Sequence, residues 1–318
     1  MSLNPRLDYS PDPLIPLNES QERARVALLE LYQSGEMETE EVPCYCGEEG
    51  GQEIAARDRY GFPVRTLLCM RCGLLRTSPR MSAAFADRFY RDLYRPLYDP
   101  AWNHPELRFE HDRRRGARMV SKIPTLLSKI ETVFDVGCAA GGALEAFRQA
   151  GKRTAGCDMT ARYIEFGRSR GLQLVEGEAA ELVDAFGGRA DLVIFSHVLE
   201  HLFDLKREFE EVLDAVRPGG FVLVMVPGLD TVATDYRGDL LLYLQNAHNY
   251  HFSAATLRMV PESCGATVLV AEEDGTALVQ RPDGWEKGRE HSIEISPRAG
   301  MENLSRLLRF ESARASVI

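Results

Sequence analysis

The sequence predicts an α/β protein, in which a doubly wound, mostly parallel seven-stranded sheet follows a small N-terminal module. Two observations carry this prediction. Between residues 131 and 280, short apolar runs alternate with segments of helical periodicity, which is the pattern of strands joined by crossover helices. Before residue 80, two close cysteine pairs stand in a segment of short strand-like runs, which is the pattern of a small metal-binding unit.

Five parallel strands are expected in the larger part, each followed by a helix or a turn. The strands are expected at 133–136, 153–158, 172–175, 190–195 and 221–226, and the helices at 143–150, 161–170, 178–186 and 205–216. The runs 267–271 and 277–280 add an antiparallel hairpin that completes seven strands.

The first strand leads into a glycine-rich turn at the start of a helix. Asp135 ends the apolar run, and Gly137 and Gly141 follow it within the turn. Glycines let the backbone approach a ligand closely, and a helix N-terminus after a strand is the usual place where an open sheet holds a nucleotide. Asp158 ends the second strand about 20 residues on, where a carboxylate can accept hydrogen bonds from ribose hydroxyls.

Four segments in this order resemble the motifs of the class I S-adenosylmethionine-dependent methyltransferases. They are DVGCAAGG, GCDMT, ADLVIFSHVLEHL and VRPGGFVLVMVP, and the resemblance covers about residues 115–280. One position departs from the family, because Ala139 stands where the middle glycine of the turn is usual. A dehydrogenase would also need a glycine turn and a ribose carboxylate, but it would not account for the Glu-His pair after the fourth strand.

The resemblance implies S-adenosyl-L-methionine as cofactor and a set of residues around it. Asp135 would hold the cofactor's amino group, the turn would pass under its ribose and methionine, Asp158 would bind the ribose, and the loop after the third strand would meet the adenine. Tyr90 and Tyr94 would line the methionine end, although packing between domains is the alternative for this pair. The expected cofactor site comprises Asp135, Gly137, Cys138 (through its backbone), Ala139, Gly141, Asp158, Met159, Glu178, Ala179, Ser196, His197, Tyr90 and Tyr94.

Four of the seven cysteines form two pairs separated by 22 residues. The pairs, Cys44/Cys46 and Cys69/Cys72, suggest a tetrahedral zinc site with four thiolate ligands and a structural role, since no coordination position stays open. Unrelated thiols or two disulfides are the alternatives, and disulfides are rare in the cytosol. The other three cysteines, Cys138, Cys157 and Cys264, are expected to be buried in the core.

The candidate catalytic residues follow the fourth and fifth strands. Glu200 and His201 open the helix that follows the fourth strand, and His248 and His251 precede a Ser-capped helix. Histidine is suited to removing a proton near neutral pH. Bracing or capping is the alternative role for all four.

The His248 segment resembles that of zinc-containing sugar C-methyltransferases. Gln245 and Ala247 stand where these enzymes have a tyrosine and a glutamate, and we expect no further C-terminal domain of about a hundred residues. The sequence therefore favours O-methylation of a hydroxyl on a sugar, glycan precursor or specialised metabolite. Nucleotide-sugar C-methylation, a non-catalytic scaffold and nucleic-acid methylation are the alternatives.

The remaining chain divides into segments of different composition. We expect a lead and helix over 1–40, the zinc module over 41–80, a helical connector over 81–130, the cofactor-binding core over 131–282 and a C-terminal extension over 283–318. Within them, helices are expected from Glu19 to about Gln33, over 82–94 (ended by Pro96), over 105–123, over 254–260 (kinked or ended by Pro261) and over 301–310.

Composition excludes several classes of function. The formal net charge of −10 disfavours broad binding to nucleic acid. No apolar stretch approaches the 18 residues of a membrane span, and the first residues lack the apolar core of a signal peptide. We therefore expect a cytoplasmic enzyme with a small-molecule or glycan acceptor.

Overall fold

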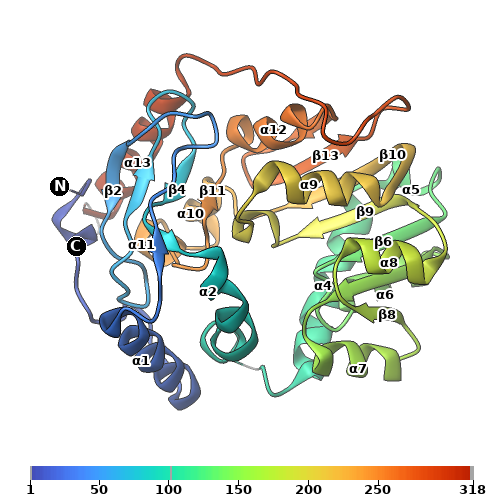
Figure 1. Cartoon of the computed structure of the whole chain (residues 1–318), viewed down its shortest axis with the longest axis horizontal. Helices are drawn as coiled ribbons and strands as arrows, with labels where there is room; N and C mark the ends of the chain where they lie inside the picture. Colours follow the sequence, from blue (N-terminus) through green and yellow to red (C-terminus); the bar gives the residue numbers. More distant parts are fainter. Residues whose placement is uncertain (1, 101, 316–318) are drawn as a thin grey trace.

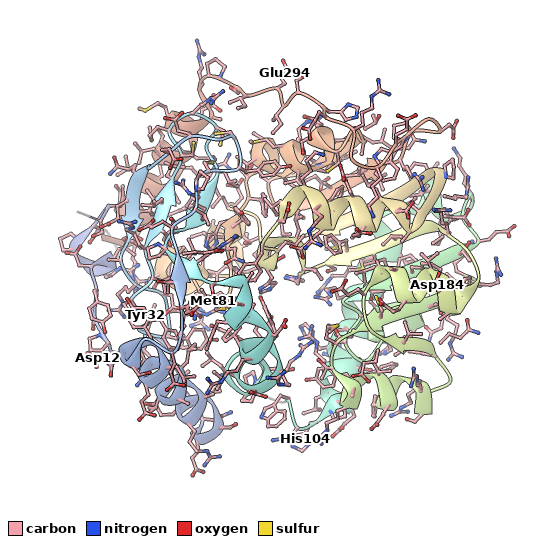
Figure 2. All side chains as sticks on the ribbon, viewed as in Figure 1. Asp12, Tyr32, Met81, His104, Asp184 and Glu294 are labelled. Atoms are coloured by element: carbon pink, nitrogen blue, oxygen red, sulfur yellow. The ribbon has the colours of Figure 1, made fainter. Side chains whose placement is uncertain are left out.

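The computed structural model describes residues 2–100 and 102–315. The chain forms a four-stranded and a seven-stranded sheet. Figure 1 shows them on opposite sides of the molecule, with α1 and α13 on the side of the smaller sheet. The chain passes from the smaller sheet to the larger one through a helical connector. It returns over the top of the view along the segment that carries Glu294 (Figure 2).

The seven-stranded sheet has the order β12-β13-β10-β9-β6-β7-β8, and only β13 runs against the other strands. Its strands are β6 (Thr132–Val136), β7 (Arg153–Asp158), β8 (Gln173–Glu176), β9 (Ala190–Ser196), β10 (Val216–Met225), β12 (Thr267–Ala271) and β13 (Thr276–Gln280). The predicted fold class, the five parallel strands and the closing hairpin are thus confirmed. β10 begins earlier than expected, since the Arg-Pro-Gly-Gly segment lies within the strand, at a shift of register.

Helices cover both faces of this sheet. One apolar core lies under α8 (Ala179–Phe186), α9 (Leu205–Asp214) and α12 (Ala254–Ser263), and the other under α4 (Pro105–Lys122), α6 (Gly142–Gln149) and α7 (Ala161–Ser169). Cys138, Cys157 and Cys264 are buried in these cores, as predicted. Because the strands are covered on both faces, their polar groups and their ligand-binding ends gather at the carboxyl edge.

The α4–α6 contact depends on glycine. A Cβ on Gly142 would lie 2.1 Å from the carbonyl oxygen of Phe109, and a Cβ on Gly116 would lie 2.4 Å from that of Ala143. The two helices therefore approach each other more closely than any larger residue would allow. This contact fixes the helix whose N-terminus follows the glycine-rich turn.

The N-terminal part forms a small sheet with a strand from the far end of the chain. It has the order β11-β4-β3-β2, and its strands are β2 (Gln52–Ala55), β3 (Thr66–Leu68), β4 (Leu75–Thr77) and β11 (Tyr250–His251). A further pair joins β1 (Thr39–Glu40) to β5 (Arg80–Met81). The predicted first helix, α1 (Glu19–Ser34), is present with a capping box between Asn18 and Gln21. The lead before it is extended except for a short turn, η1 (Pro5–Leu7), which buries Leu7.

Two expected helix ends were wrong. The connector stays helical through α2 (Ala83–Arg88), a π-helical turn η2 (Phe89–Tyr94) and α3 (Arg95–Tyr98), so Pro96 does not end it. Pro96 falls within the first turn of α3, where a missing N–H breaks no helical bond. α12 likewise continues past Pro261 to Ser263, because its buried side chains hold it against β12 and α9.

Shorter elements complete the chain: α5 (Pro124–Leu127), η3 (Leu199–His201), α10 (Thr231–Thr234), α11 (Leu240–Tyr243) and α13 (Ala299–Ala315). The last helix, α13, is longer than the predicted 301–310, and it packs against the N-terminal part of the chain. Asn303 donates a 2.8 Å hydrogen bond to the carbonyl of Gly73, so α13 packs on the cysteine module. None of the helices in the described residues is long and apolar enough to cross a membrane.

Candidate active site

The glycine-rich turn lies between the carboxyl end of β6 and α6. Gly137 and Gly141 have φ values near +78°, and Ala139 has φ +49°. The turn thus keeps the left-handed geometry of a glycine at position 139 although alanine occupies it, so the Cβ of Ala139 adds a conformational cost that a glycine there would not have. Cys138 is buried beside the turn.

Asp158 ends β7 and faces this turn. Its carboxylate accepts hydrogen bonds from the backbone N–H of Ala139 at 2.8 Å and of Thr160 at 2.9 Å. Arg95 of the connector approaches the same carboxylate at 3.5 Å, and its guanidinium lies over the ring of Tyr163. The next residue, Met159, is 70% exposed and offers an apolar surface beside the carboxylate.

Asp135 is buried at the end of β6. Burial raises the pKa of Asp135 to about 8, against the opposing charge of Arg115, while Asp112 adds to the rise. Asp112 is itself buried and pairs with both Arg108 and Arg115 of α4. A cation placed close to Asp135 would lower this pKa and favour the ionised carboxylate.

The other expected cofactor residues lie around the same edge of the sheet. Glu178 is exposed and caps α8, and Ala179 is buried behind it. Ser196 ends β9, and its buried hydroxyl has no hydrogen-bond partner among the residues that the structure describes. His197 follows with φ +57°. These residues follow the carboxyl ends of β8 and β9, on either side of β6 and β7, and their role in cofactor binding stays a prediction.

Tyr90 and Tyr94 form an aromatic wall beside His201. Their ring centroids are 5.0 Å apart, and each ring meets the His201 imidazole edge to face, at 6.2 Å and 5.7 Å. The packing alternative for this pair also holds in part, since both rings contact the buried Phe89. Tyr98 extends the wall next to Tyr94.

The four candidate catalytic residues form one buried cluster. The ring centroids of His201 and His248 are 4.9 Å apart, and those of His248 and His251 are 5.6 Å apart. Nε2 of both His201 and His248 lies 3.9 Å from Glu200 Oε1, and His197 Nδ1 lies 3.4 Å from it. The mostly buried imidazoles of His201 and His248 thus lie beside one buried carboxylate, an arrangement that is more typical of a functional site than of an apolar core.

Burial controls the ionisation of this cluster. It lowers the pKa of His201 and His251, the latter to about 3, and holds the pKa of His248 well below its usual value. Burial alone would raise the pKa of Glu200, but the close approach of His197 brings it below its usual value. At neutral pH the cluster thus combines a carboxylate with neutral imidazoles, which can accept protons.

Asn249 ties the two halves of the cluster together. Its side chain donates hydrogen bonds to the carbonyls of His201 and Leu202, and its backbone N–H donates to the carbonyl of Glu200. The carbonyl of Asn249 in turn accepts from the N–H of Thr77 in the cysteine module. The loop that carries His248 is therefore anchored on both sides.

Several residues of the site escaped sequence reasoning. Arg95 contacts Asp158, and Arg59 bonds to Gln245 and the carbonyl of Leu242. Asn246 accepts from the Tyr98 hydroxyl, while its backbone N–H donates to Asp58. Each partner lies in the N-terminal part or the connector, and no local motif marks such residues. The one feature of the sequence that could have pointed to these contacts is the group of tyrosines in the connector.

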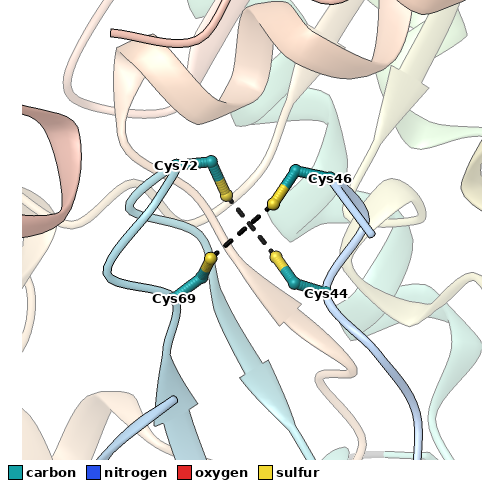
Figure 3. Close-up of side chains that lie close together, drawn as sticks. All are labelled: Cys44, Cys46, Cys69 and Cys72. Carbon is teal, nitrogen blue, oxygen red and sulfur yellow. Dashed lines mark hydrogen bonds between the residues drawn. The ribbon is translucent and has the colours of Figure 1, made fainter. Parts of the chain in front are cut away.

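The four paired cysteines point at one another (Figure 3). Cys44 Sγ lies 3.5 Å from Cys72 Sγ, Cys46 Sγ lies 3.7 Å from Cys69 Sγ, and all four sulfurs lie within 4.8 Å of one another. A tetrahedral zinc ion with Zn–S bonds of about 2.3 Å places its sulfurs about 3.8 Å apart. Backbone amides of Arg71 and Cys72 also bond to the Cys69 sulfur, as expected of a Cys-x-x-Cys-Gly turn. The site fits zinc.

The fold, the glycine turn and the strand-end carboxylate together define a class of protein, the S-adenosylmethionine-dependent methyltransferases. The family described as "Methyltransferase domain" matches residues 109–270, about half of the chain. The chain belongs to this family, and S-adenosyl-L-methionine is its cofactor.

Individual relatives are distant. The chain is similar to a ubiquinone biosynthesis O-methyltransferase of Chelativorans sp. (strain BNC1), at 22% identity over 51% of this chain and 68% of that protein. It is also similar to the C-methyltransferase NovU of Streptomyces niveus, at 26% identity over 72% of this chain and 53% of NovU, so the chain spans about half the length of that relative. A solved 1,6-didemethyltoxoflavin-N1-methyltransferase of Burkholderia thailandensis, with bound S-adenosylhomocysteine, covers 69% of this chain and 96% of its own at 14% identity and a TM-score of 0.47.

Proposed function

We propose that the protein transfers the methyl group of S-adenosylmethionine to a hydroxyl of a sugar, a glycan precursor or a specialised metabolite. The observation that carries the proposal is the buried cluster of neutral imidazoles around Glu200, next to the end of β9. A sulfonium methyl is already electrophilic, so the protein must align the acceptor oxygen in line with it and remove one proton. A neutral imidazole of the cluster is the proton acceptor, and His248 is the first candidate.

The contacts of Gln245 and Ala247 support oxygen rather than carbon as the acceptor atom. The Gln245 side chain is held by Arg59, and Ala247 contributes only its carbonyl, to His201. Neither Gln245 nor Ala247 has an acidic or basic side chain, so the only such groups in the cluster are its imidazoles and the Glu200 carboxylate. Deprotonating a hydroxyl at the moment of transfer needs one such group, whereas enolising a ketone also needs a group that stabilises the enolate oxygen.

Methyl transfer from labelled S-adenosylmethionine to a panel of hydroxylated sugars and phenols tests the proposal. For an accepted substrate, we expect His248→Asn to lower kcat at least 100-fold while the affinity for S-adenosylhomocysteine stays unchanged. His104→Gln, at an exposed histidine in the connector, is the matched control. If no hydroxyl compound is methylated while the cofactor binds normally, O-methylation is ruled out.

Nucleotide-sugar C-methylation is the second candidate, and one observation favours it. The similarity to NovU covers 72% of this chain, whereas residues 109–318 make up only 66% of it. The similarity must therefore extend into the part of the chain before residue 109. Deuterium exchange at the α-carbon of a keto-sugar, lost in His248→Asn, would favour this candidate over O-methylation.

We also propose that Cys44, Cys46, Cys69 and Cys72 bind a structural zinc ion. Four thiolates complete a tetrahedral zinc shell and leave no position for a substrate. Thiolate sites of this kind suit a reducing compartment, which supports a cytoplasmic location. The net charge of −10 supports a small-molecule or glycan acceptor rather than nucleic acid.

A further inference from the structure

The catalytic cluster contains a second group of metal-ligating side chains, separate from the cysteines. One oxygen of Glu200, one nitrogen of His201 and one nitrogen of His248 all lie within 4.8 Å of one another. We propose that these three residues bind a divalent transition-metal ion, and that this ion receives an oxygen of the acceptor. The role in acceptor binding rests on the proposed function, whereas the metal site itself does not.

Glu200 is the first argument for the ion. Its side chain is 2% exposed, and within the described residues neither carboxylate oxygen has a hydrogen-bond partner. Burial of an ionised carboxylate without hydrogen bonds costs several kcal/mol, and buried charges are normally paired or coordinate a metal. The nearest nitrogens of His201 and His248, both 3.9 Å from Oε1, lie beyond hydrogen-bond distance of it. A cation at this carboxylate supplies the missing charge.

The tautomer of His201 is the second argument. Its Nδ1 lies 2.8 Å from the carbonyl oxygen of Ala247, which can only accept a hydrogen bond, so Nδ1 carries the proton. The lone pair is thereby placed on Nε2, the atom that lies 3.9 Å from Glu200 Oε1. Histidines that bind metals typically donate their other N–H to a backbone carbonyl or a carboxylate in this way.

The distances fit a common ion. Ligand atoms lie about 2.0–2.2 Å from a zinc-like metal, so two ligands on one ion are separated by at most about 4.4 Å. Both carboxylate-to-imidazole separations are 3.9 Å, and the imidazole pair needs at most a small closure. The bonds of Asn249 hold the segments of Glu200, His201 and His248 together, so the site is preorganised.

The donor set identifies the class of metal. Two imidazoles and one carboxylate suit Zn²⁺, Fe²⁺ or Co²⁺ and leave coordination positions open. An open position on the side of Tyr90 and Tyr94 would take an acceptor oxygen, and an acceptor with two adjacent oxygens, such as a vicinal diol, a catechol or a hydroxyketone, would chelate the ion. A hydroxyl on the ion would lose its proton more readily. With the ion bound, His248 is a ligand instead of the proton acceptor, and His251, beside it, takes over that role.

Cobalt titration of the full chain, with zinc already in the cysteine site, tests the proposal. We expect one Co²⁺ per chain to produce visible d–d bands without thiolate-to-cobalt charge transfer. Glu200→Gln and His201→Asn should each weaken Co²⁺ binding at least tenfold, whereas Glu176→Gln, an exposed carboxylate at the end of β8, should not. The thermal unfolding midpoint of each variant must show that it is folded.

The possible outcomes separate the metal site from the proposed function. Wild-type protein that shows only thiolate-bound cobalt, or affinity unchanged in folded Glu200→Gln, overturns the metal site. Methyl transfer that continues in a chelator also overturns the role of the ion in acceptor binding, while it leaves O-methylation intact. If a vicinal diol or a catechol lowers the dissociation constant of Co²⁺, and the corresponding mono-alcohol does not, both parts of the inference are supported.

Discussion

His251 of β11 lies directly opposite Leu75 of β4, so the strand that follows His248 completes the sheet of the cysteine module. The N–H of Thr77 in the same strand, β4, bonds to the carbonyl of Asn249, and its hydroxyl bonds to the carbonyl of His248. The cysteine turn between β3 and β4 therefore supports the loop that carries His248 through a few hydrogen bonds. The glycine turn and Asp158 belong to the other sheet.

This arrangement predicts that loss of the cysteine site affects acceptor chemistry more than cofactor binding. Cys72→Ser should release the metal, lower the thermal midpoint by several degrees and reduce methyl transfer at least tenfold, because β4 no longer holds β11. The affinity for S-adenosylhomocysteine, measured by calorimetry, should change less than threefold. Cys264→Ala, at a buried cysteine outside the group of four, is the control. A chelator should lower its thermal midpoint as much as it lowers that of the wild-type protein. A chelator that leaves the wild-type midpoint unchanged would contradict the prediction.

Asp158 should dominate cofactor affinity. Asp158→Asn keeps an oxygen that can accept from the N–H of Ala139 but removes the charge that favours the ribose hydroxyls and pairs with Arg95. We expect the dissociation constant of S-adenosylhomocysteine to rise at least tenfold, or about 1.4 kcal/mol. Glu176→Gln removes the same charge from the neighbouring strand end and should leave the affinity within a factor of two. If the two variants bind S-adenosylhomocysteine equally well, the assignment of Asp158 to the ribose is wrong.

The buried histidines should make stability depend on acidity. Burial lowers the pKa of His251 to about 3, with Arg59 and His201 acting in the same direction and Glu200 opposing them, whereas a histidine in the unfolded chain has a pKa near 6.5. Between these values the unfolded state binds the proton and the folded state does not. The stability that His251 contributes is therefore present above pH 6.5 and is lost as the pH falls toward 3.

Denaturant unfolding at pH 7.5, 6 and 5 measures this loss. At 1.36 kcal/mol for each pKa unit, the contribution is on the order of a few kcal/mol. His251→Gln should flatten the pH dependence, and His104→Gln, at an exposed position, should leave it as in the wild-type protein. A pH dependence that is the same in all three proteins would contradict the buried, neutral state of His251.

The sequence was sufficient for the elements whose pattern is local. The alternation of apolar strands and helices placed β6 to β10, and the acidic residues at strand ends placed Asp135 and Asp158 at one edge of the sheet. In a doubly wound sheet these ends meet by topology, so no long-range information is needed.

The sequence was not sufficient where distant segments meet. Glu200 and His248 come together only because β11 leaves the core and pairs with β4, and a two-residue strand carries no periodicity that predicts its partner. The position of Arg95 against Asp158 depends likewise on helix continuing through Pro96, where the general tendency of proline to end helices gave the wrong answer.

The contact between α4 and α6 should limit substitution next to the cofactor turn. In Gly142→Ala, the new methyl would lie 2.1 Å from the carbonyl oxygen of Phe109, so α4 must move. Alanine's higher helix propensity favours the variant by about 1 kcal/mol, but the forced shift of a packed helix costs about 1–3 kcal/mol, and we expect net destabilisation. Because Gly142 directly follows Gly141, the shift should also weaken S-adenosylhomocysteine binding several-fold.

Gly284→Ala introduces the same methyl into open space and should change neither property. Thermal unfolding and calorimetry of the two variants make the comparison, and a Gly142→Ala protein as stable as Gly284→Ala would mean that the two helices are not in fixed contact.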